Sequence, residues 1–114
     1  MASGCLFCNI VAGEIPSDKV HETDKVLAFE DINPAAPTHV LVIPKEHIVS
    51  AHELKAEHAQ VLADIFEVAA AIAEERNVTE GYRVVTNVGS RAGQSVFHIH
   101  FHVLGGRDLA WPPG

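Results

Sequence analysis

Three histidines alternate with apolar residues in the run from Ser95 to Leu104. A period of two is typical of a β-strand, so we expect His98, His100 and His102 on one face of a strand. The opposite face, which we expect to pack in the core, consists of Phe97, Ile99, Phe101 and Val103. Residues on one face are about 6.6 Å apart, which separates the outer imidazoles by about 13 Å and predicts different roles for them. A merely solvated face would more often mix Thr, Lys, Glu and Ser.

A second candidate for chemistry lies at the start of the chain. Cys5 and Cys8 are the only cysteines, and their spacing is C-x-x-C. In a reducing compartment this spacing indicates a metal-binding or redox pair rather than a structural disulfide.

The length, composition and net charge of the chain exclude several classes of protein. With 114 residues, 47% of them apolar and 20% charged, the chain is expected to form one soluble domain spanning residues 1–114. The net charge of −7 argues against a nucleic-acid partner, although a local site can still bind a small phosphorylated ligand. No apolar run approaches the length of about 18 residues that a membrane span needs. Because the N-terminus also lacks the features of a signal peptide, we expect no membrane partner and a cytoplasmic location.

The remaining pattern supplies the elements that must position these residues. We expect a short helix over 5–12, strands over 20–22, 26–29, 39–43 and 82–87, and one long helix over 55–76. An apolar stripe on the long helix consists of Val61, Leu62, Ile65, Phe66, Ala69, Ile72 and Ala73. These elements predict an α+β fold with an antiparallel sheet that the long helix covers on one face.

Several motifs, taken in order, resemble the histidine triad (HIT) superfamily. They are Asp31-Ile32-Asn33-Pro34, Pro37-Thr38-His39, Val42-Ile43-Pro44-Lys45-x-His47-Ile48, Gly93-Gln94-Ser95-Val96 and the histidine row itself. The ending Gly105-Gly106-Arg107 with Trp111-Pro112-Pro113-Gly114 looks like the Hint branch, the purine nucleoside phosphoramidases. The resemblance implies a HIT-like fold with a five-stranded antiparallel sheet and one long and one short helix. It also implies a homodimer in which the two sheets join.

The implied activity is hydrolysis of adenosine or guanosine 5′-phosphoramidates, including nucleotidyl-lysine, and of mixed aminoacyl adenylates. By resemblance, His100 is the nucleophile that forms a covalent nucleotidyl-histidine, and His102 contacts the phosphate and helps to protonate the leaving amine. His39 supports the proton relay, and Ser95 contacts the phosphate. The residues implied in nucleotide binding are Phe7, Phe29, Asp31, Ile32, Asn87, Gly93, Gln94, Ser95, Val96, His100, His102 and Trp111.

Some of these roles have simpler alternatives. Phe7 and Phe29 would be ordinary core residues without the resemblance, and Trp111, implied to reach the partner's site across the dimer, could be a packing anchor. Asn87 could equally end a strand.

Catalysis is expected to need no cofactor, but the resemblance implies a structural zinc ion. Related proteins with C-x-x-C bind zinc through residues that match Cys5, Cys8, His47 and His98. Two sulfur and two nitrogen ligands make a closed tetrahedral site. The competing interpretation leaves the cysteines as small buried residues and His98 hydrogen-bonded in the core.

Two other functions compete with the phosphoramidase. A dinucleoside polyphosphate hydrolase of the Fhit branch would lack the Trp-Pro-Pro-Gly ending. A non-catalytic nucleotide-binding or scaffold protein would keep the pocket without the chemistry.

Overall fold

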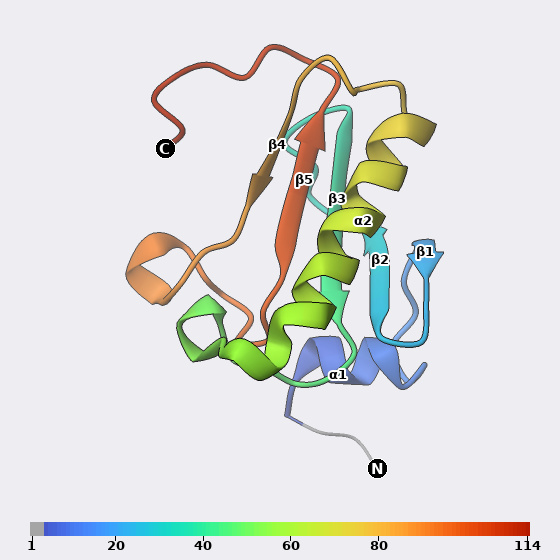
Figure 1. Cartoon of the computed structure of the whole chain (residues 1–114), viewed down its shortest axis with the longest axis vertical. Coiled ribbons are helices and arrows are strands. Elements are labelled where there is room, and N and C mark those ends of the chain that lie inside the picture. Colours follow the sequence, from blue (N-terminus) through green and yellow to red (C-terminus); the bar gives the residue numbers. More distant parts are fainter. Residues whose placement is uncertain (1–3) are drawn as a thin grey trace.

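One antiparallel sheet forms the centre of the molecule, and the computed structural model describes residues 4–114. The strand order is β1-β2-β3-β5-β4. The strands are β1 (Lys19–Glu22), β2 (Val26–Glu30), β3 (Thr38–Pro44), β4 (Tyr82–Val85) and β5 (Phe101–Gly105). The helices are α1 (Leu6–Val11) and α2 (Ala59–Glu75), with short 3-10 turns at Ala51–Glu53, Ala56–His58 and Ser90–Ala92. The α+β fold, with five antiparallel strands and one long and one short helix, is therefore confirmed (Figure 1).

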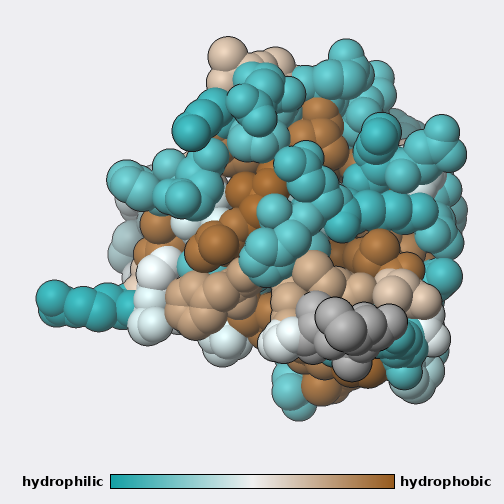
Figure 2. All heavy atoms as spheres, turned by 90° about the horizontal axis from the view of Figure 1, so that it is seen from below, coloured by the Kyte–Doolittle hydropathy of each residue, from teal (hydrophilic) through white to brown (hydrophobic). Residues whose placement is uncertain are grey.

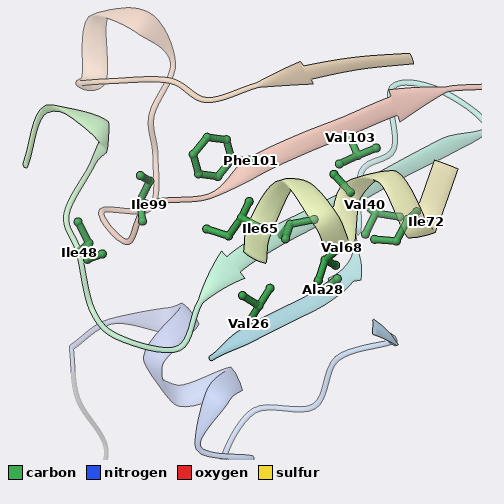
Figure 3. Packing of buried hydrophobic residues seen from close by; sticks show 12 residues of the cluster. Val26, Ala28, Val40, Ile48, Ile65, Val68, Ile72, Ile99, Phe101 and Val103 are labelled. Atoms are coloured by element: carbon green, nitrogen blue, oxygen red, sulfur yellow. The ribbon is translucent and has the colours of Figure 1, made fainter. Parts of the chain in front are cut away.

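Helix α2 covers one face of the sheet, because its apolar stripe meets alternate residues of the strands (Figure 3). The cluster consists of Val26, Ala28, Val40, Val42, Ile48, Ile65, Val68, Ala69, Ile72, Ile99, Phe101 and Val103. The predicted stripe is confirmed except at Phe66, which is 49% exposed. Phe66 lies at the edge of the stripe, where its ring contacts that of Phe101 edge-on.

Helix α1 covers part of the opposite face. The intervening strand residues point there, and a second buried cluster consists of Phe7, Ile10, Leu27, Phe29, Leu41 and Ile43. Since Phe101 and Val103 of β5 belong to the α2 side, His102 between them projects toward the α1 side. The α2 face therefore forms the larger core, and the α1 face combines a smaller buried cluster with the side chain of His102.

The prediction that one strand runs through all three histidines is wrong, because β5 begins only at Phe101. The pairing of Val42 with Phe101, continued by two residues, would place Ile99 opposite Pro44. Proline has no N–H to donate to a ladder, and the backbone N–H of Ile99 donates instead to the carbonyl of Ile48 at 2.6 Å. Without the ladder, side chains before Phe101 no longer alternate between the two faces of the sheet. The predicted core residue Phe97 is accordingly 46% exposed.

Apolar side chains also reach the surface at the end of the molecule where α1 lies (Figure 2). The exposed large apolar residues include Leu6, Val49 and Phe97.

Among residues 4–114, no helix is both long enough and apolar enough to cross a membrane.

Candidate active site and metal centre

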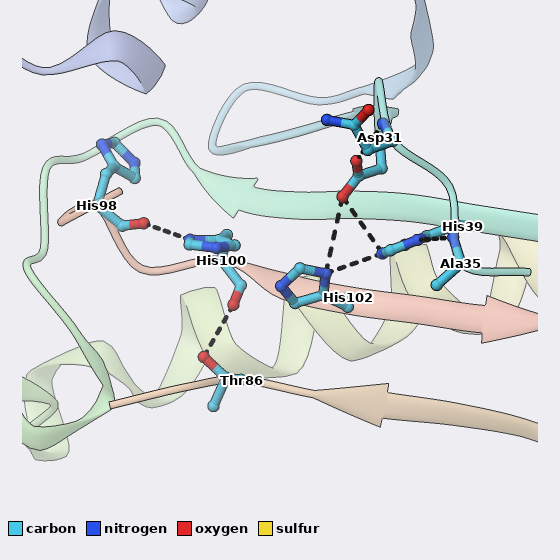
Figure 4. Close-up of polar contacts among 8 residues, drawn as sticks. Asp31, Ala35, His39, Thr86, His98, His100 and His102 are labelled. Atoms are coloured by element: carbon cyan, nitrogen blue, oxygen red, sulfur yellow. Dashed lines mark hydrogen bonds and ion pairs between the residues drawn. The ribbon is translucent and has the colours of Figure 1, made fainter. Parts of the chain in front are cut away.

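Two hydrogen bonds hold His100, one at its ring and one at its backbone carbonyl. Its Nδ1 lies 2.8 Å from the carbonyl oxygen of His98, which can only accept, so Nδ1 carries the proton. The hydroxyl of Thr86 on the chain after β4 donates to the carbonyl of His100 at 2.8 Å (Figure 4). In the neutral ring the remaining nitrogen, Nε2, therefore keeps an unshared electron pair. A neutral imidazole in this tautomer is a competent nucleophile.

A chain of hydrogen bonds also determines which ring nitrogen of His102 carries the proton. The backbone N–H of Ala35 donates to Nδ1 of His39 at 2.9 Å, so the neutral His39 ring carries its proton on Nε2. That nitrogen lies 2.9 Å from Nδ1 of His102 and 3.3 Å from Oδ2 of Asp31. Donation from His39 to His102 leaves the His102 proton on Nε2. His102 can thus donate a proton beside the ring of His100, 5.1 Å away between centroids.

The pKa of His102 is lowered from 6.5 to about 4, chiefly by burial and also by positive charge on His100 and His39, while Asp31 opposes the shift. His102 is consequently neutral at pH 7 in the ligand-free protein. An anion bound beside it would add to the effect of Asp31 and raise this pKa.

A cavity of about 570 Å³ opens on the α1 face beside these rings. Eight of the residues predicted to bind nucleotide line it: Phe7, Phe29, Asp31, Ile32, Ser95, Val96, His100 and His102. Further apolar walls that the sequence did not single out come from Leu6, Ile10 and Leu41. The structure therefore brings an apolar cleft, a carboxylate and two imidazoles together.

Four predicted residues do not line this cavity: Asn87, Gly93, Gln94 and Trp111. Gln94 is buried, and its amide donates to the carbonyls of Val49 and Val96 while accepting from the N–H of Gly89. It thus fixes the loop that delivers Ser95 and Val96. Trp111 is 83% exposed on the C-terminal tail.

The four predicted metal ligands converge at the N-terminal end of α1. Nδ1 of His98 lies 3.4 Å from Sγ of Cys5 and 3.4 Å from Sγ of Cys8, and Nδ1 of His47 lies 3.3 Å from Sγ of Cys8. A tetrahedral zinc ion with Zn–S of about 2.3 Å and Zn–N of about 2.0 Å requires S···N separations of about 3.5 Å. Nε2 of His98 donates to the carbonyl of Pro44 at 2.8 Å, which leaves Nδ1 unprotonated as a ligand must be. The donor set fits zinc.

A second cluster of potential ligand atoms comes from Asp31, His39 and His102. These atoms are close enough to share a metal ion, but the His39 nitrogen among them is not free of its proton. Nδ1 of His39 accepts from Ala35, so the nitrogen that faces the cluster carries a proton in the neutral ring. A metal there would have to displace that proton and break the bond to Ala35. This cluster fits proton transfer instead.

Comparison with known proteins agrees with this geometry. The family model described as "Scavenger mRNA decapping enzyme C-term binding" matches residues 4–109. The crystal structure of a HIT family hydrolase from Legionella pneumophila superposes with a TM-score of 0.95 at 49% identity, covering 97% of this chain and all of that chain. The chain belongs to the histidine triad family.

Similarity to a curated phosphoramidase places it in the Hint-like branch of that family. The purine nucleoside phosphoramidase of Escherichia coli K12 is 48% identical over 110 residues, which cover 96% of this chain and 92% of that protein. A protein of Zea mays named 14 kDa zinc-binding protein is 46% identical over 114 residues, covering 98% of this chain and 89% of the relative.

Some residues that determine this Hint-like site carry no signal in the sequence. Ala35 and Pro44 act through a backbone N–H and a carbonyl, which residue type does not reveal. Thr86 could have been noticed as a hydroxyl beside Asn87 at the end of a predicted strand, but its partner is again a backbone carbonyl.

The lowered pKa of His102 predicts a pH-dependent stability. Between about pH 6.5 and 4 the unfolded chain binds more protons at this position than the folded one, so stability falls as the pH falls through this window. We expect His102→Gln to reduce the loss of unfolding free energy between pH 7 and pH 4.5 by about 2 kcal/mol, measured by urea unfolding. The two proteins differ only at residue 102, so an equal loss in the variant would contradict the assignment.

Proposed function

We propose that this protein is a purine nucleoside phosphoramidase, which hydrolyses adenosine and guanosine 5′-phosphoramidates such as nucleotidyl-lysine, and also aminoacyl adenylates, which are mixed anhydrides. The observation that carries the proposal is the hydrogen bond from Nδ1 of His100 to the carbonyl of His98, beside the ring of His102 in the wall of the cavity. In the neutral ring this bond leaves Nε2 of His100 unprotonated. The similarity to the E. coli phosphoramidase supports it.

The cavity suits a purine nucleoside. Phe7 and Phe29 are buried and contact each other edge-on, with ring centroids 5.4 Å apart, so they offer apolar walls that tolerate either purine. Oδ1 of Asp31 accepts from the N–H of Asn33 at 2.8 Å, and Oδ2 faces His39. Each carboxylate oxygen has a second lone pair, so Asp31 can still accept from both ribose hydroxyls.

In the first step, Nε2 of His100 attacks phosphorus as the P–N bond to the amine breaks. The phosphorylated ring gains positive charge, which the carbonyl of His98 stabilises at Nδ1. The amine nitrogen takes a proton from Nε2 of His102. The negative charge of the substrate, together with Asp31, favours an extra proton in the His39–His102 pair of the complex.

In the second step, water attacks phosphorus and the bond from phosphorus to Nε2 of His100 breaks. The proton from water returns to the His39–His102 pair, which balances the cycle and releases the nucleoside monophosphate. Ser95 lines the cavity beside these rings, where its hydroxyl and backbone can serve the phosphate oxygens. For Gly93 we propose a supporting role, because its left-handed backbone, with φ of 99°, ends the turn Ser90–Ala92 that precedes Ser95. We propose a supporting role for Asn87 as well, because its side chain packs beside Gly93.

We also propose that Cys5, Cys8, His47 and His98 hold a structural zinc ion. A closed set of four ligands leaves no position for substrate, so the ion would tie α1 to the chain after β3 and before β5 without entering the reaction.

A homodimer joined along β4 completes the proposal. Both edge strands have an open side in the described chain, but β1 carries two charged residues, Lys19 and Glu22. Strand β4 starts at the exposed Tyr82, and its one charged residue, Arg83, is bound to the C-terminal tail. Arg83 of β4 holds the tail by donating to the carbonyls of Leu109 and Ala110, which positions Trp111 to reach a partner. Sedimentation velocity should give a dimer, and a monomer at micromolar concentration would contradict this model.

The activity is tested with an adenosine 5′-phosphoramidate of a fluorescent amine. We expect release of amine and AMP, and a fall in kcat of about 10³-fold or more in His100→Gln. The exposed His52 offers a matched control, and His52→Gln should keep the wild-type rate. Wild-type protein quenched in alkali during turnover, where the P–N bond to histidine is stable, should gain the mass of one nucleoside monophosphate less one water on His100.

The alternatives give other results. Cleavage of diadenosine polyphosphates in preference to the phosphoramidate would support the dinucleoside polyphosphate hydrolase. AMP binding without turnover of either substrate would support a binding protein. An unchanged rate in His100→Gln would remove the nucleophile assignment.

Metal analysis tests the zinc site separately. Purified wild-type protein should contain about one zinc per chain, and the double variant Cys5→Ser/Cys8→Ser should contain almost none. Equal zinc in both proteins would rule out this ligand set.

A further inference from the structure

One residue belongs to both the metal centre and the active site. The ring of His98 has no exposed surface, and its Nδ1 faces the sulfur atoms of Cys5 and Cys8. The carbonyl of the same residue accepts the Nδ1 proton of His100 (Figure 4). Any shift of His98 that accompanies metal binding therefore moves the acceptor that sets the tautomer of His100.

A second physical connection runs through Phe7, which lies between the two cysteines on α1. Its buried ring lies edge-on to the ring of His100, with centroids 5.1 Å apart and an interplanar angle of 86°. The same ring lines the nucleotide cavity. It also lies edge-on to His98, with centroids 6.1 Å apart. Helix α1 has only six residues, and so short a helix is not stable without its tertiary contacts. Its position, and with it that of Phe7, depends on how its two cysteines are held.

We infer that metal binding and nucleotide binding are coupled, so that each tightens the other, with His98 as the positioning residue and Phe7 as the wall shared by both sites. This inference rests on the proposed function, because it takes the ligand of the cavity to be a purine nucleoside monophosphate. The physical cause is pre-organisation: the metal removes freedom of α1 and His98 that the nucleotide would otherwise have to restrict. Linkage requires the same factor in both directions.

Two binding measurements test the coupling. The zinc affinity is measured by competition with a chromophoric chelator, with and without saturating AMP, and the AMP affinity by calorimetry on zinc-loaded and metal-depleted protein. We expect AMP to tighten zinc binding by about 5- to 50-fold, and zinc to tighten AMP binding by the same factor.

A third measurement uses protein fully loaded with Co²⁺ in place of zinc. Because the cobalt absorption bands report the geometry of the thiolate and imidazole ligands, saturating AMP should shift them. This readout does not depend on folding, since the loaded protein is folded before and after AMP is added.

Two matched variants localise the connection. Phe7→Leu keeps all four metal ligands but removes the ring, and it should reduce the effect of AMP on zinc affinity to about twofold or less. Phe66→Leu makes the same change on the edge of α2, on the other face of the sheet. In this variant AMP should tighten zinc binding by the same factor as in the wild type.

The outcomes separate this inference from the proposed function. If AMP binds equally well to loaded and depleted protein and zinc affinity does not respond to AMP, the coupling is wrong and the phosphoramidase proposal stands. If AMP does not bind the loaded protein, the proposed function fails and the coupling fails with it. A change in zinc affinity without any change in the cobalt spectrum would mean that AMP only stabilises the folded chain, which also overturns the coupling.

Discussion

The hydrogen bond from Nδ1 of His100 to the carbonyl of His98 is the interaction on which the rest of the site depends. An imidazole has two nitrogens and, when neutral, one proton, so occupying one nitrogen as a donor defines the other as an electron-pair donor. The bond spans only two residues, which makes it insensitive to movements elsewhere in the sheet. It also joins the proposed nucleophile to a residue whose ring faces two thiols. The chemistry on His100 is thus defined by backbone geometry rather than by a neighbouring acid.

That geometry exists because the ladder between β3 and β5 stops. Pro44 has no N–H, and its carbonyl accepts from the ring of His98 rather than from a strand. The backbone from Ser95 to His100 is therefore free to bend, and the carbonyl of His98 can point back at the ring two residues on. In a continuous strand His98 and His100 would be held about 6.6 Å apart. The break in the strand is what divides the histidine row into a metal ligand and a reactive pair.

Much of this arrangement could be predicted from the sequence. The alternation of Phe101, His102 and Val103 correctly separated a core face from a histidine face, since a period of two holds wherever the ladder is intact. Spacing and residue type, with the family resemblance, were enough to bring Cys5 and His98 into one cluster. The elements themselves also followed from their apolar periods.

What could not be predicted depends on backbone partners and on where a ladder ends. Phe97 was expected in the core because the alternation continues through it, but sequence alone does not show that the ladder between β3 and β5 ends at Val42 and Phe101. The tautomers of His39 and His102 depend on the N–H of Ala35, a group that every residue except proline possesses. Gln94 was expected at the nucleotide, yet its amide is used inside the loop. A polar side chain in a motif does not reveal whether it faces the ligand or the backbone.

Nitrogen-15 NMR of the imidazole rings in zinc-loaded protein near pH 7 tests the central claim most directly. The account predicts that His100 is protonated on Nδ1 and unprotonated on Nε2. It also predicts that His39 and His102 carry their protons on Nε2. A His100 ring protonated on Nε2 would contradict the account, because it would have no electron pair to direct at phosphorus.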